Sequence, residues 1–180
     1  AESLDQPCSE RCQVCVGKEP IDISLIIEVD GWRLYLSNLE NANCYRNQHT
    51  CSIGAILSIG VHTMLSKQTI QHHQFIPLKD NPQSDLISIL PKCIQFIRVQ
   101  QKAKRNVLLH CYAGISRSVS VCIAYLMVDM NMPLLNALIH VKSRRRVSEP
   151  NYGFIDQLES LSQNMSEFRT LLNNLDGLLD

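Results

Sequence analysis

The chain has 180 residues, 45% of them hydrophobic, a size that suits one compact domain with a substantial core and leaves no room for a second catalytic domain. Lysine plus arginine equals aspartate plus glutamate at 17 each, and this zero net charge argues against a general nucleic-acid or membrane binder. The sequence has no apolar run long enough to cross a membrane and no basic start leading into an apolar signal segment, so we expect a soluble protein.

The chain opens with a polar stretch without periodicity, and we expect residues 1–22 to be poorly ordered. Two strand-like runs follow at 23–29 and 32–36. They flank Asp30-Gly31, a dipeptide typical of the tight turn in a β-hairpin. Two strands joined by this turn should therefore open the folded part of the chain.

Strands and helices alternate in the next part of the sequence. Apolar runs at 53–59 and 73–78 are typical of buried parallel strands, with a short helix expected between them. Residues 84–101 carry apolar side chains at helical spacing, a further strand ends at His110, and a helix is expected over 116–130. Because such strands pair in parallel through right-handed crossovers, the pattern predicts an α/β fold with a central, mostly parallel twisted sheet of about five strands flanked by helices.

Three helical segments complete the pattern. The segment 154–161 is expected to pack on the sheet domain, and residues 162–180 form an amphipathic helical extension with an apolar stripe. We expect this stripe to pack on the same domain, with a dimer or partner interface as the alternative. A third helix is expected at 133–146, before these two in the chain. It ends in basic residues that suit a helix C-terminus: Lys142, Arg144, Arg145 and Arg146.

The most informative segment is the loop between the strand that ends at His110 and the helix after it. Cys111 and Arg117 bound a short loop that can turn its backbone N–H groups toward one anion. The following helix adds unpaired N–H groups and the positive end of its dipole, and Arg117 adds a planar fork suited to two phosphate oxygens. Gly114 lets the backbone turn sharply. These features predict a phosphate-binding loop formed by Tyr112, Ala113, Gly114, Ile115, Ser116 and Arg117.

The same environment stabilises an anion on the sulfur of Cys111. A cysteine beside a helix N-terminus and an arginine ionises readily, so we expect a thiolate nucleophile at neutral pH. Ser118 follows the arginine and can hydrogen-bond that sulfur. A cysteine after an apolar run is, taken alone, more often structural. The combination with His110, Arg117 and Ser118 favours the catalytic interpretation.

This segment resembles the signature of the dual-specificity phosphatases, a group within the cysteine-dependent protein tyrosine phosphatases, in His110-Cys111 followed by Ala113-Gly114-Ile115-Ser116-Arg117-Ser118. The segments 123–127, 141–145 and 150–154 resemble the helices that follow in that family. The resemblance implies a catalytic domain over 23–161, of the atypical single-domain kind, and a phosphocysteine intermediate. We assign supporting roles to His110 and to Asn151, which matches the asparagine that helps to hold the loop in relatives.

The displaced alkoxide or phenolate needs a proton, so the mechanism requires an acid outside the loop. The candidates are Asp80 and Asp85. The segment 76–80 resembles the strand end that leads to the general-acid loop of the family, and Asp80 is therefore our choice, as acid in the first step and as base toward water in the second. Asp85 is expected to be an exposed aspartate at a helix start.

The eight cysteines bear on metal binding and on the cellular compartment. A thiolate enzyme with a usable core belongs in a reducing compartment, so we expect every cysteine to be reduced and the protein to be intracellular, in the cytoplasm, the nucleus or both. Three cysteines are close enough in sequence to share a zinc ion, with Cys44 or Cys51 as a fourth ligand, but the stretch around them is polar and we expect no metal. The three are Cys8, Cys12 and Cys15. No cofactor is expected either.

The loop chemistry requires only a phosphate monoester. The side chains of Tyr112, Ala113 and Ile115 add no positive charge, whereas relatives that act on phosphoinositides tend to carry lysines there, so we expect phosphotyrosine and phosphoserine or phosphothreonine of a protein. A phosphatase of a phosphoinositide or an RNA 5′-phosphate is one alternative, and a phosphoprotein-binding pseudophosphatase is another. The basic residues at 142–146 are either solvated or orient a phosphorylated substrate. We expect no nucleic-acid or membrane partner, and a homodimer through 162–180 stays open.

Overall fold

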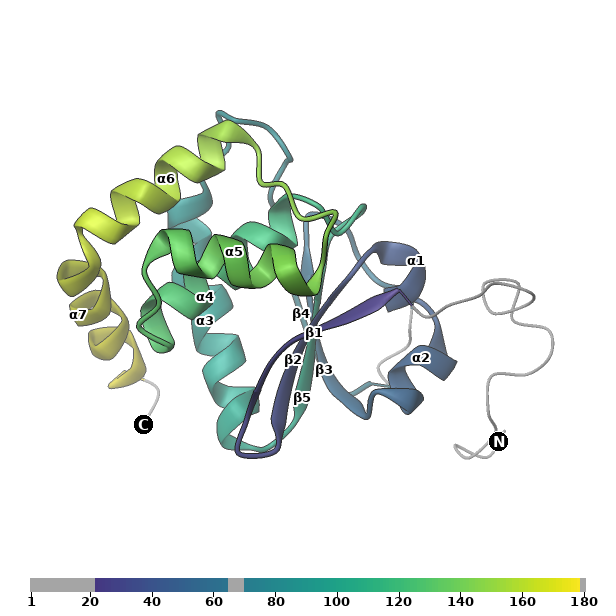
Figure 1. Cartoon of the computed structure of the whole chain (residues 1–180). Coiled ribbons are helices and arrows are strands. Elements are labelled where there is room, and N and C mark those ends of the chain that lie inside the picture. The colour runs from purple at the N-terminus through teal and green to yellow at the C-terminus, as the bar shows by residue number, and fades with distance from the viewer. Residues whose placement is uncertain (1–21, 65–69, 179–180) are drawn as a thin grey trace.

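The computed structural model describes residues 22–64 and 70–178 and contains a five-stranded sheet in the order β1-β2-β5-β3-β4 (Figure 1). Strand β1 pairs antiparallel with β2, and the other neighbours are parallel. The strands are β1 (Ile23–Val29), β2 (Trp32–Ser37), β3 (Ile53–Ile59), β4 (His72–Ile76) and β5 (Asn106–His110).

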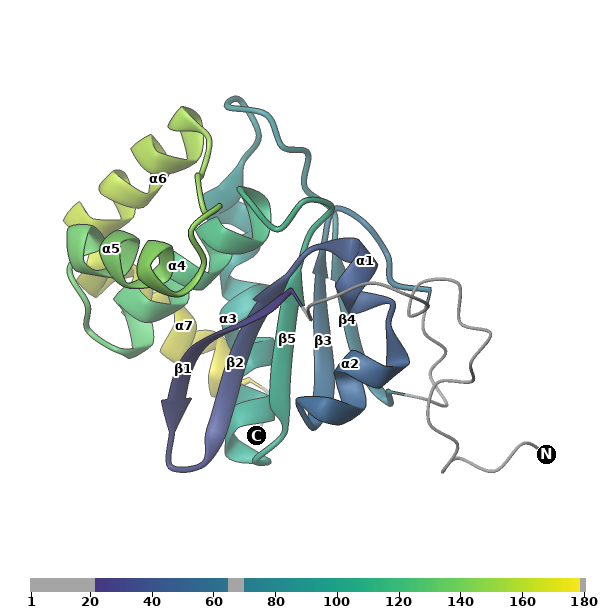
Figure 2. The ribbon, with the colours of Figure 1, turned by 45° about the vertical axis from the view of Figure 1, so that its right-hand side comes forward.

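Helices cover both faces of the sheet. The short helices α1 and α2 lie on one face, and α3 and α4 lie on the other with α5, α6 and α7 outside them (Figures 1 and 2). The helices are α1 (Leu39–Ala42), α2 (Tyr45–Thr50), α3 (Leu86–Lys102), α4 (Arg117–Asp129), α5 (Leu134–Arg144), α6 (Tyr152–Gln163) and α7 (Met165–Asp176).

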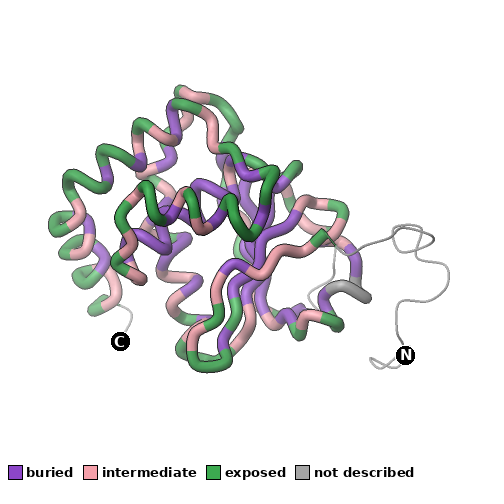
Figure 3. Tube along the Cα trace, in the orientation of Figure 1, coloured by how far each residue is buried: buried purple, intermediate pink, exposed green. Residues whose placement is uncertain are grey.

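Side chains alternate across the strands and fill two cores, one on each face of the sheet. In β3, Ala55 and Leu57 belong to the larger core toward α3 and α4, whereas Ile56 between them belongs to the smaller core toward α1 and α2. Helix α4 is buried at every position from 118 to 128, because the sheet, α3, α5 and α6 surround it (Figure 3). Its first turn, which carries the end of the predicted phosphate loop, is therefore held rigidly.

The structure confirms the predicted α/β class, the five strands and the hairpin. Asp30 and Gly31 both have positive φ, 49° and 80°, as the tight hairpin turn requires. The strand expected at 73–78 ends at Ile76 instead, because Pro77 has no N–H to donate to the sheet. Residues 1–21 lie outside the described residues, as do 65–69, where part of the short helix between β3 and β4 was expected.

Two helices were not predicted, because they are short and polar and show no apolar periodicity. Helix α1 is a single turn, and the Asn38 side chain caps it by accepting from the Asn41 N–H at 2.9 Å. It matters for the site because the Leu39 N–H at the start of α1 donates to the Tyr112 carbonyl of the predicted phosphate loop.

One side of the C-terminal stripe packs on the rest of the domain, while Leu171 and Leu178 are exposed. Phe168 and Leu172 of α7 are buried in the larger core, and Asp176 accepts from Arg98 of α3 at 2.6 Å. Arg98 also contacts Asp129 at 2.7 Å, so α7 is tied to α3 and to the end of α4. In the described ranges, no helix combines the length and the apolar character that crossing a membrane requires.

Candidate active site

The candidate site lies at the carboxyl edge of the parallel strands. Cys111 directly follows β5, and His110 lies beside Ser37 of β2 and Ser58 of β3. Asp80 comes four residues after the end of β4, which is parallel to β3. Because parallel strands end at the same edge, segments 31 residues apart in sequence meet there, as expected for ligand sites in such sheets.

Four carbonyl groups of the loop accept hydrogen bonds from donors outside it. The Cys111 carbonyl accepts from His110 Nδ1 (3.0 Å) and the Tyr112 carbonyl accepts from the Leu39 N–H (2.9 Å). The Gly114 carbonyl accepts from Arg145 Nε (2.8 Å) and the Ile115 carbonyl accepts from the Glu149 N–H (2.8 Å). In a planar trans peptide the N–H points away from the preceding carbonyl. Holding these carbonyls outward therefore turns the N–H groups of residues 112, 113, 115 and 116 toward the centre of the loop, which makes a concave anion site.

Gly114 is required at its position by two constraints. Its φ is +66°, and a Cβ there would lie 2.6 Å from the Ser37 carbonyl oxygen and 2.7 Å from Arg145 Nη2. The loop at Gly114 is thus packed between the end of β2 and Arg145, the residue that follows α5. Only glycine fits both the turn and the space.

His110 orients the start of the loop as a neutral donor. The Cys111 carbonyl can only accept, so Nδ1 carries the proton, and Nε2 then accepts from Ser58 Oγ at 2.6 Å. Burial lowers the pKa of His110 to about 4, because the interior disfavours the charged ring. The imidazole consequently stays neutral near pH 7 and acts as a brace.

The Cys111 sulfur lies at the floor of the loop. Its residue is 2% exposed, and Sγ is 3.2 Å from Ser118 Oγ in the first turn of α4. A thiolate can only accept, so Ser118 donates to it when the sulfur is ionised. Two other free cysteines are fully buried: burial raises the pKa of the Cys93 thiol to about 12 and also raises the pKa of the Cys122 thiol, which keeps both protonated.

Arg117 has a free donor for an anion. Its Nη1 donates to the Leu78 carbonyl at 3.2 Å, whereas its buried Nε has no partner among the described residues. A buried N–H without an acceptor is costly, and a phosphate oxygen would satisfy it. Gly60 (φ +76°) makes room for this arginine, since a Cβ there would collide with Arg117 Nη1 and with the Leu78 carbonyl. The sequence pattern gave no sign of this role for Gly60.

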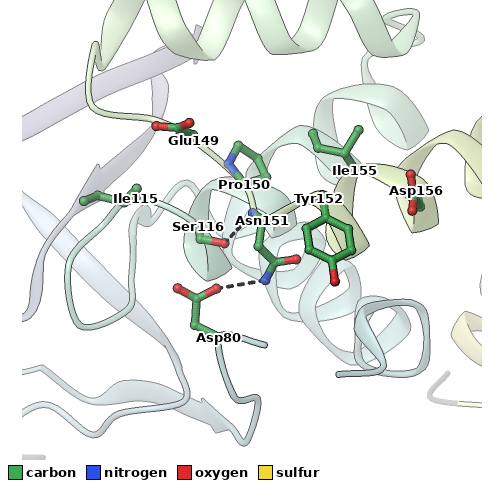
Figure 4. A pocket seen from close by; sticks show the side chains of 9 residues that line it. All are labelled: Asp80, Ile115, Ser116, Glu149, Pro150, Asn151, Tyr152, Ile155 and Asp156. Atoms are coloured by element: carbon green, nitrogen blue, oxygen red, sulfur yellow. Dashed lines mark hydrogen bonds between the residues drawn. The ribbon is translucent and has the colours of Figure 1, made fainter. Parts of the chain in front are cut away.

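Asp80 lies beside the loop and is held by Asn151. The Asn151 side chain donates through Nδ2 to Asp80 Oδ1 at 2.9 Å, and its backbone N–H donates to Ser116 Oγ at 2.9 Å (Figure 4). Asn151 also caps α6 by accepting from Phe154 N–H. Asp85 lies elsewhere: it is exposed and caps α3 by accepting from the Ser88 N–H at 3.1 Å. Of the two candidate acids, Asp80 is therefore the one placed near the loop.

The expectation that the basic residues at 142–146 are solvated or orient a substrate is wrong for Arg145. Lys142, Arg144 and Arg146 are exposed, but Arg145 is 3% exposed and neither solvated nor open to a substrate. Besides the Gly114 carbonyl, it contacts Asp22 through Nη1 at 2.8 Å and Nη2 at 3.3 Å. The partners are 31 and 123 residues away in sequence, so helical spacing alone cannot separate this arginine from its neighbours.

The cysteine expectations need one correction. Cys44 is disulfide-bonded, so the prediction that all cysteines are reduced is wrong there, while Cys51 is free. Cys8, Cys12 and Cys15 lie outside the described residues. Within the described part of the chain, no group of three His, Cys, Asp or Glu side chains is placed to hold a metal ion.

Comparison with known proteins agrees with this geometry. Residues 34–164 match the family model for the dual specificity phosphatase catalytic domain. Dual specificity protein phosphatase 5 of Rattus norvegicus is 35% identical over 125 residues, which are 69% of this chain and 33% of that protein. Dual specificity protein phosphatase 4 of the same species is 40% identical over 161 residues, covering 87% of this chain and 38% of that protein.

The fold has a solved counterpart in the crystal structure of DUSP15, with a TM-score of 0.76 and 29% sequence identity over 86% of this chain and 97% of that chain. The chain spans about a third of the length of the two rat relatives, 33% and 38%. Fold, loop and sequence matches agree: the chain belongs to the dual-specificity phosphatases of the cysteine-dependent protein tyrosine phosphatase superfamily.

Proposed function

We propose that this chain is a protein phosphatase that hydrolyses phosphotyrosine and phosphoserine or phosphothreonine through a phosphocysteine intermediate on Cys111. The observation that carries the proposal is the loop itself, whose carbonyls accept hydrogen bonds from donors outside it. Cys111 lies at its start and Arg117 at its end, and the buried Nε of Arg117 has no partner in the described part of the chain. Such a ring of donors stabilises the equatorial oxygens of a phosphoryl group as it is transferred.

In the first step, the Cys111 sulfur attacks phosphorus, an S–P bond forms, and the ester P–O bond breaks. The leaving oxygen takes a proton from the carboxylic acid of Asp80, which becomes a carboxylate. Ser118 donates to the sulfur and stabilises it before attack. Asn151 keeps Asp80 beside the loop through the 2.9 Å hydrogen bond.

In the second step, the Asp80 carboxylate takes a proton from water as the water oxygen attacks phosphorus. The S–P bond breaks, and the electron pair returns to Cys111 as a thiolate that Ser118 again stabilises. Inorganic phosphate leaves, and Asp80 is protonated for the next cycle. No oxidant, reductant or further reactant enters the balance.

The surroundings of the loop favour a protein substrate over a phosphoinositide. Tyr112 and Ile115 are 67% and 37% exposed, so apolar side chains rather than cations face the solvent from the loop. The cavity of about 560 Å³ beside Asp80 is lined by three carboxylates and no cation: Asp80, Glu149 and Asp156 (Figure 4). An inositol lipid carrying several phosphates would be repelled there.

The test is a parallel assay of phosphopeptides, phosphoinositides, an RNA 5′-phosphate and para-nitrophenyl phosphate. We expect turnover of the aryl phosphate and of the phosphopeptides, and loss of both in Cys111→Ser. Binding of phosphopeptides without any turnover would support a pseudophosphatase instead, and a preference for lipid or RNA would reject the protein substrate.

We further propose that the protein acts inside the cell, in the cytoplasm or the nucleus, because the Cys111 sulfur must remain reduced to attack phosphorus. The Cys44 disulfide argues for a more oxidising environment. Alkylation of free thiols in intact cells, followed by mass spectrometry, distinguishes the two. The homodimer through 162–180 remains part of the proposal, since Leu171 of α7 is 47% exposed, and sedimentation of the intact chain tests it.

A further inference from the structure

An apolar groove runs between α4, α5 and the segment before α6, outside the residues assigned to catalysis. Its volume is about 580 Å³. Apolar side chains form most of its walls: Val119 and Ile123 of α4, Leu138 and Ile139 of α5, Pro150 and Ile155. Ile139 is 61% exposed, so part of this wall faces solvent.

A buried polar atom in the groove lacks a partner. Ser148 lines the groove and is only 4% exposed, yet its Oγ has no hydrogen-bond partner among the described residues. A hydroxyl buried without a partner costs free energy unless a ligand or water satisfies it. The groove therefore combines a wall that favours an apolar group with one position for a hydrogen-bonding group.

The groove is continuous with the catalytic cleft. Glu149, Pro150 and Ile155 line both the groove and the cavity that contains Asp80, Ile115 and Ser116. A substrate peptide whose phosphorylated residue lies in the phosphate loop can extend past Asp80 and reach the groove across these shared residues. A peptide can supply both an apolar group for the walls and a hydrogen-bonding group for Ser148 Oγ, because each apolar side chain is attached to backbone N–H and C=O groups.

We propose that the groove binds an apolar side chain of the phosphoprotein substrate, near in sequence to the phosphorylated residue, with Ser148 Oγ bonded to the substrate backbone. The proposal rests on the proposed phosphatase function. It makes the groove a determinant of substrate sequence, with leucine, isoleucine or methionine as the side chains whose size and polarity fit the walls.

The experiment compares kcat/KM for phosphotyrosine peptides in which leucine or alanine stands at each successive position on either side of the phosphotyrosine. In the unmodified chain, leucine at one position should raise kcat/KM about tenfold, the effect of burying most of one such side chain. Ile139→Asp and Ser148→Ile, which charge or fill the groove, should remove this preference. Leu135→Asp is the matched control, since Leu135 is 66% exposed on the same helix and does not line the groove.

Para-nitrophenyl phosphate, which cannot reach the groove, should be hydrolysed equally by all four proteins. Equal kcat/KM for leucine and alanine at every position, or a preference that survives in Ile139→Asp, would overturn the proposal while leaving the phosphatase function intact. A groove filled by a second copy of the chain would instead give a dimer that Ile139→Asp dissociates and no leucine preference, which also overturns it. Absence of turnover with every substrate would reject the phosphatase function itself.

Discussion

The hydrogen bonds of Arg145 to the Gly114 carbonyl and to Asp22 give the sharpest prediction for a residue outside the segment from His110 to Ser118. In Arg145→Met the Gly114 carbonyl loses its donor, and a buried acceptor left unsatisfied costs about 1–3 kcal/mol of unfolding free energy. Asp22, whose side chain is 54% exposed, is rehydrated when the ion pair is lost and adds little to this cost. Methionine keeps most of the buried volume, so the variant should fold.

The catalytic effect follows from the peptide between Gly114 and Ile115. Once the carbonyl is released, the Ile115 N–H is no longer fixed toward the bound phosphate, and we expect kcat to fall by about tenfold to a hundredfold, below or near the loss typical of removing one oxyanion donor. The assay measures kcat and KM with para-nitrophenyl phosphate and the inhibition constant of inorganic phosphate. A positioning role requires that phosphate inhibition weaken together with the loss in kcat.

Arg146→Met is the matched control, because Arg146 has the same charge, adjoins Arg145 and is exposed. It should change neither stability nor phosphate inhibition. An Arg145→Met protein that is destabilised but inhibited by phosphate as strongly as the unmodified chain would refute the reasoning, because the arginine would then support only the fold.

The remaining predictions concern three other parts of the site. Asp80→Asn should lower kcat/KM, which reports the first step, by about 10²- to 10⁴-fold on phosphopeptides and much less on para-nitrophenyl phosphate, whose leaving group needs no proton; equal losses of kcat/KM on both would move the acid role elsewhere. Because burial lowers the pKa of His110 to about 4 while the unfolded histidine titrates near 6.5, the unfolded state takes up the proton first. Stability should therefore fall as pH drops from 6.5 toward 4, by at most about 3 kcal/mol, and urea titrations should show a shallower dependence in His110→Asn; identical slopes would contradict this. Peroxide should inactivate the enzyme reversibly through the Cys111 sulfur, with recovery on adding a thiol, and a chelator should leave activity unchanged; strict metal dependence would be incompatible with the mechanism.

The sequence allowed the prediction of those features that depend on local pattern. The hairpin at Asp30-Gly31, strand β3 and helix α3 follow from turn residues and periodicity within short windows. The loop that begins at Cys111 could be found because its residue types sit within a dozen positions. Asp80 was reached only through the resemblance to a family, since an aspartate in a turn has no distinguishing local pattern.

The residues that brace the loop could not be predicted in this way, because each acts through contacts distant in sequence. Arg145 is one of three consecutive arginines, and only its reach to Gly114 and Asp22 separates it from two solvated neighbours. Gly60 matters because the side chain of Arg117 crosses it. The backbone N–H of Glu149 holds the Ile115 carbonyl, and a backbone donor leaves no trace in the side-chain sequence.

The most direct test of the account is the identity of the atom that receives the phosphoryl group. Asp80→Asn, mixed with para-nitrophenyl phosphate and quenched rapidly in acid, should accumulate a covalent enzyme, since the good leaving group permits the first step and the missing base slows the second. Mass spectrometry of the digested protein is expected to place the phosphoryl group on the Cys111 sulfur, with none found when Cys111 is also replaced by serine. A phosphoryl group on another residue, or hydrolysis with no covalent enzyme under these conditions, would contradict the account.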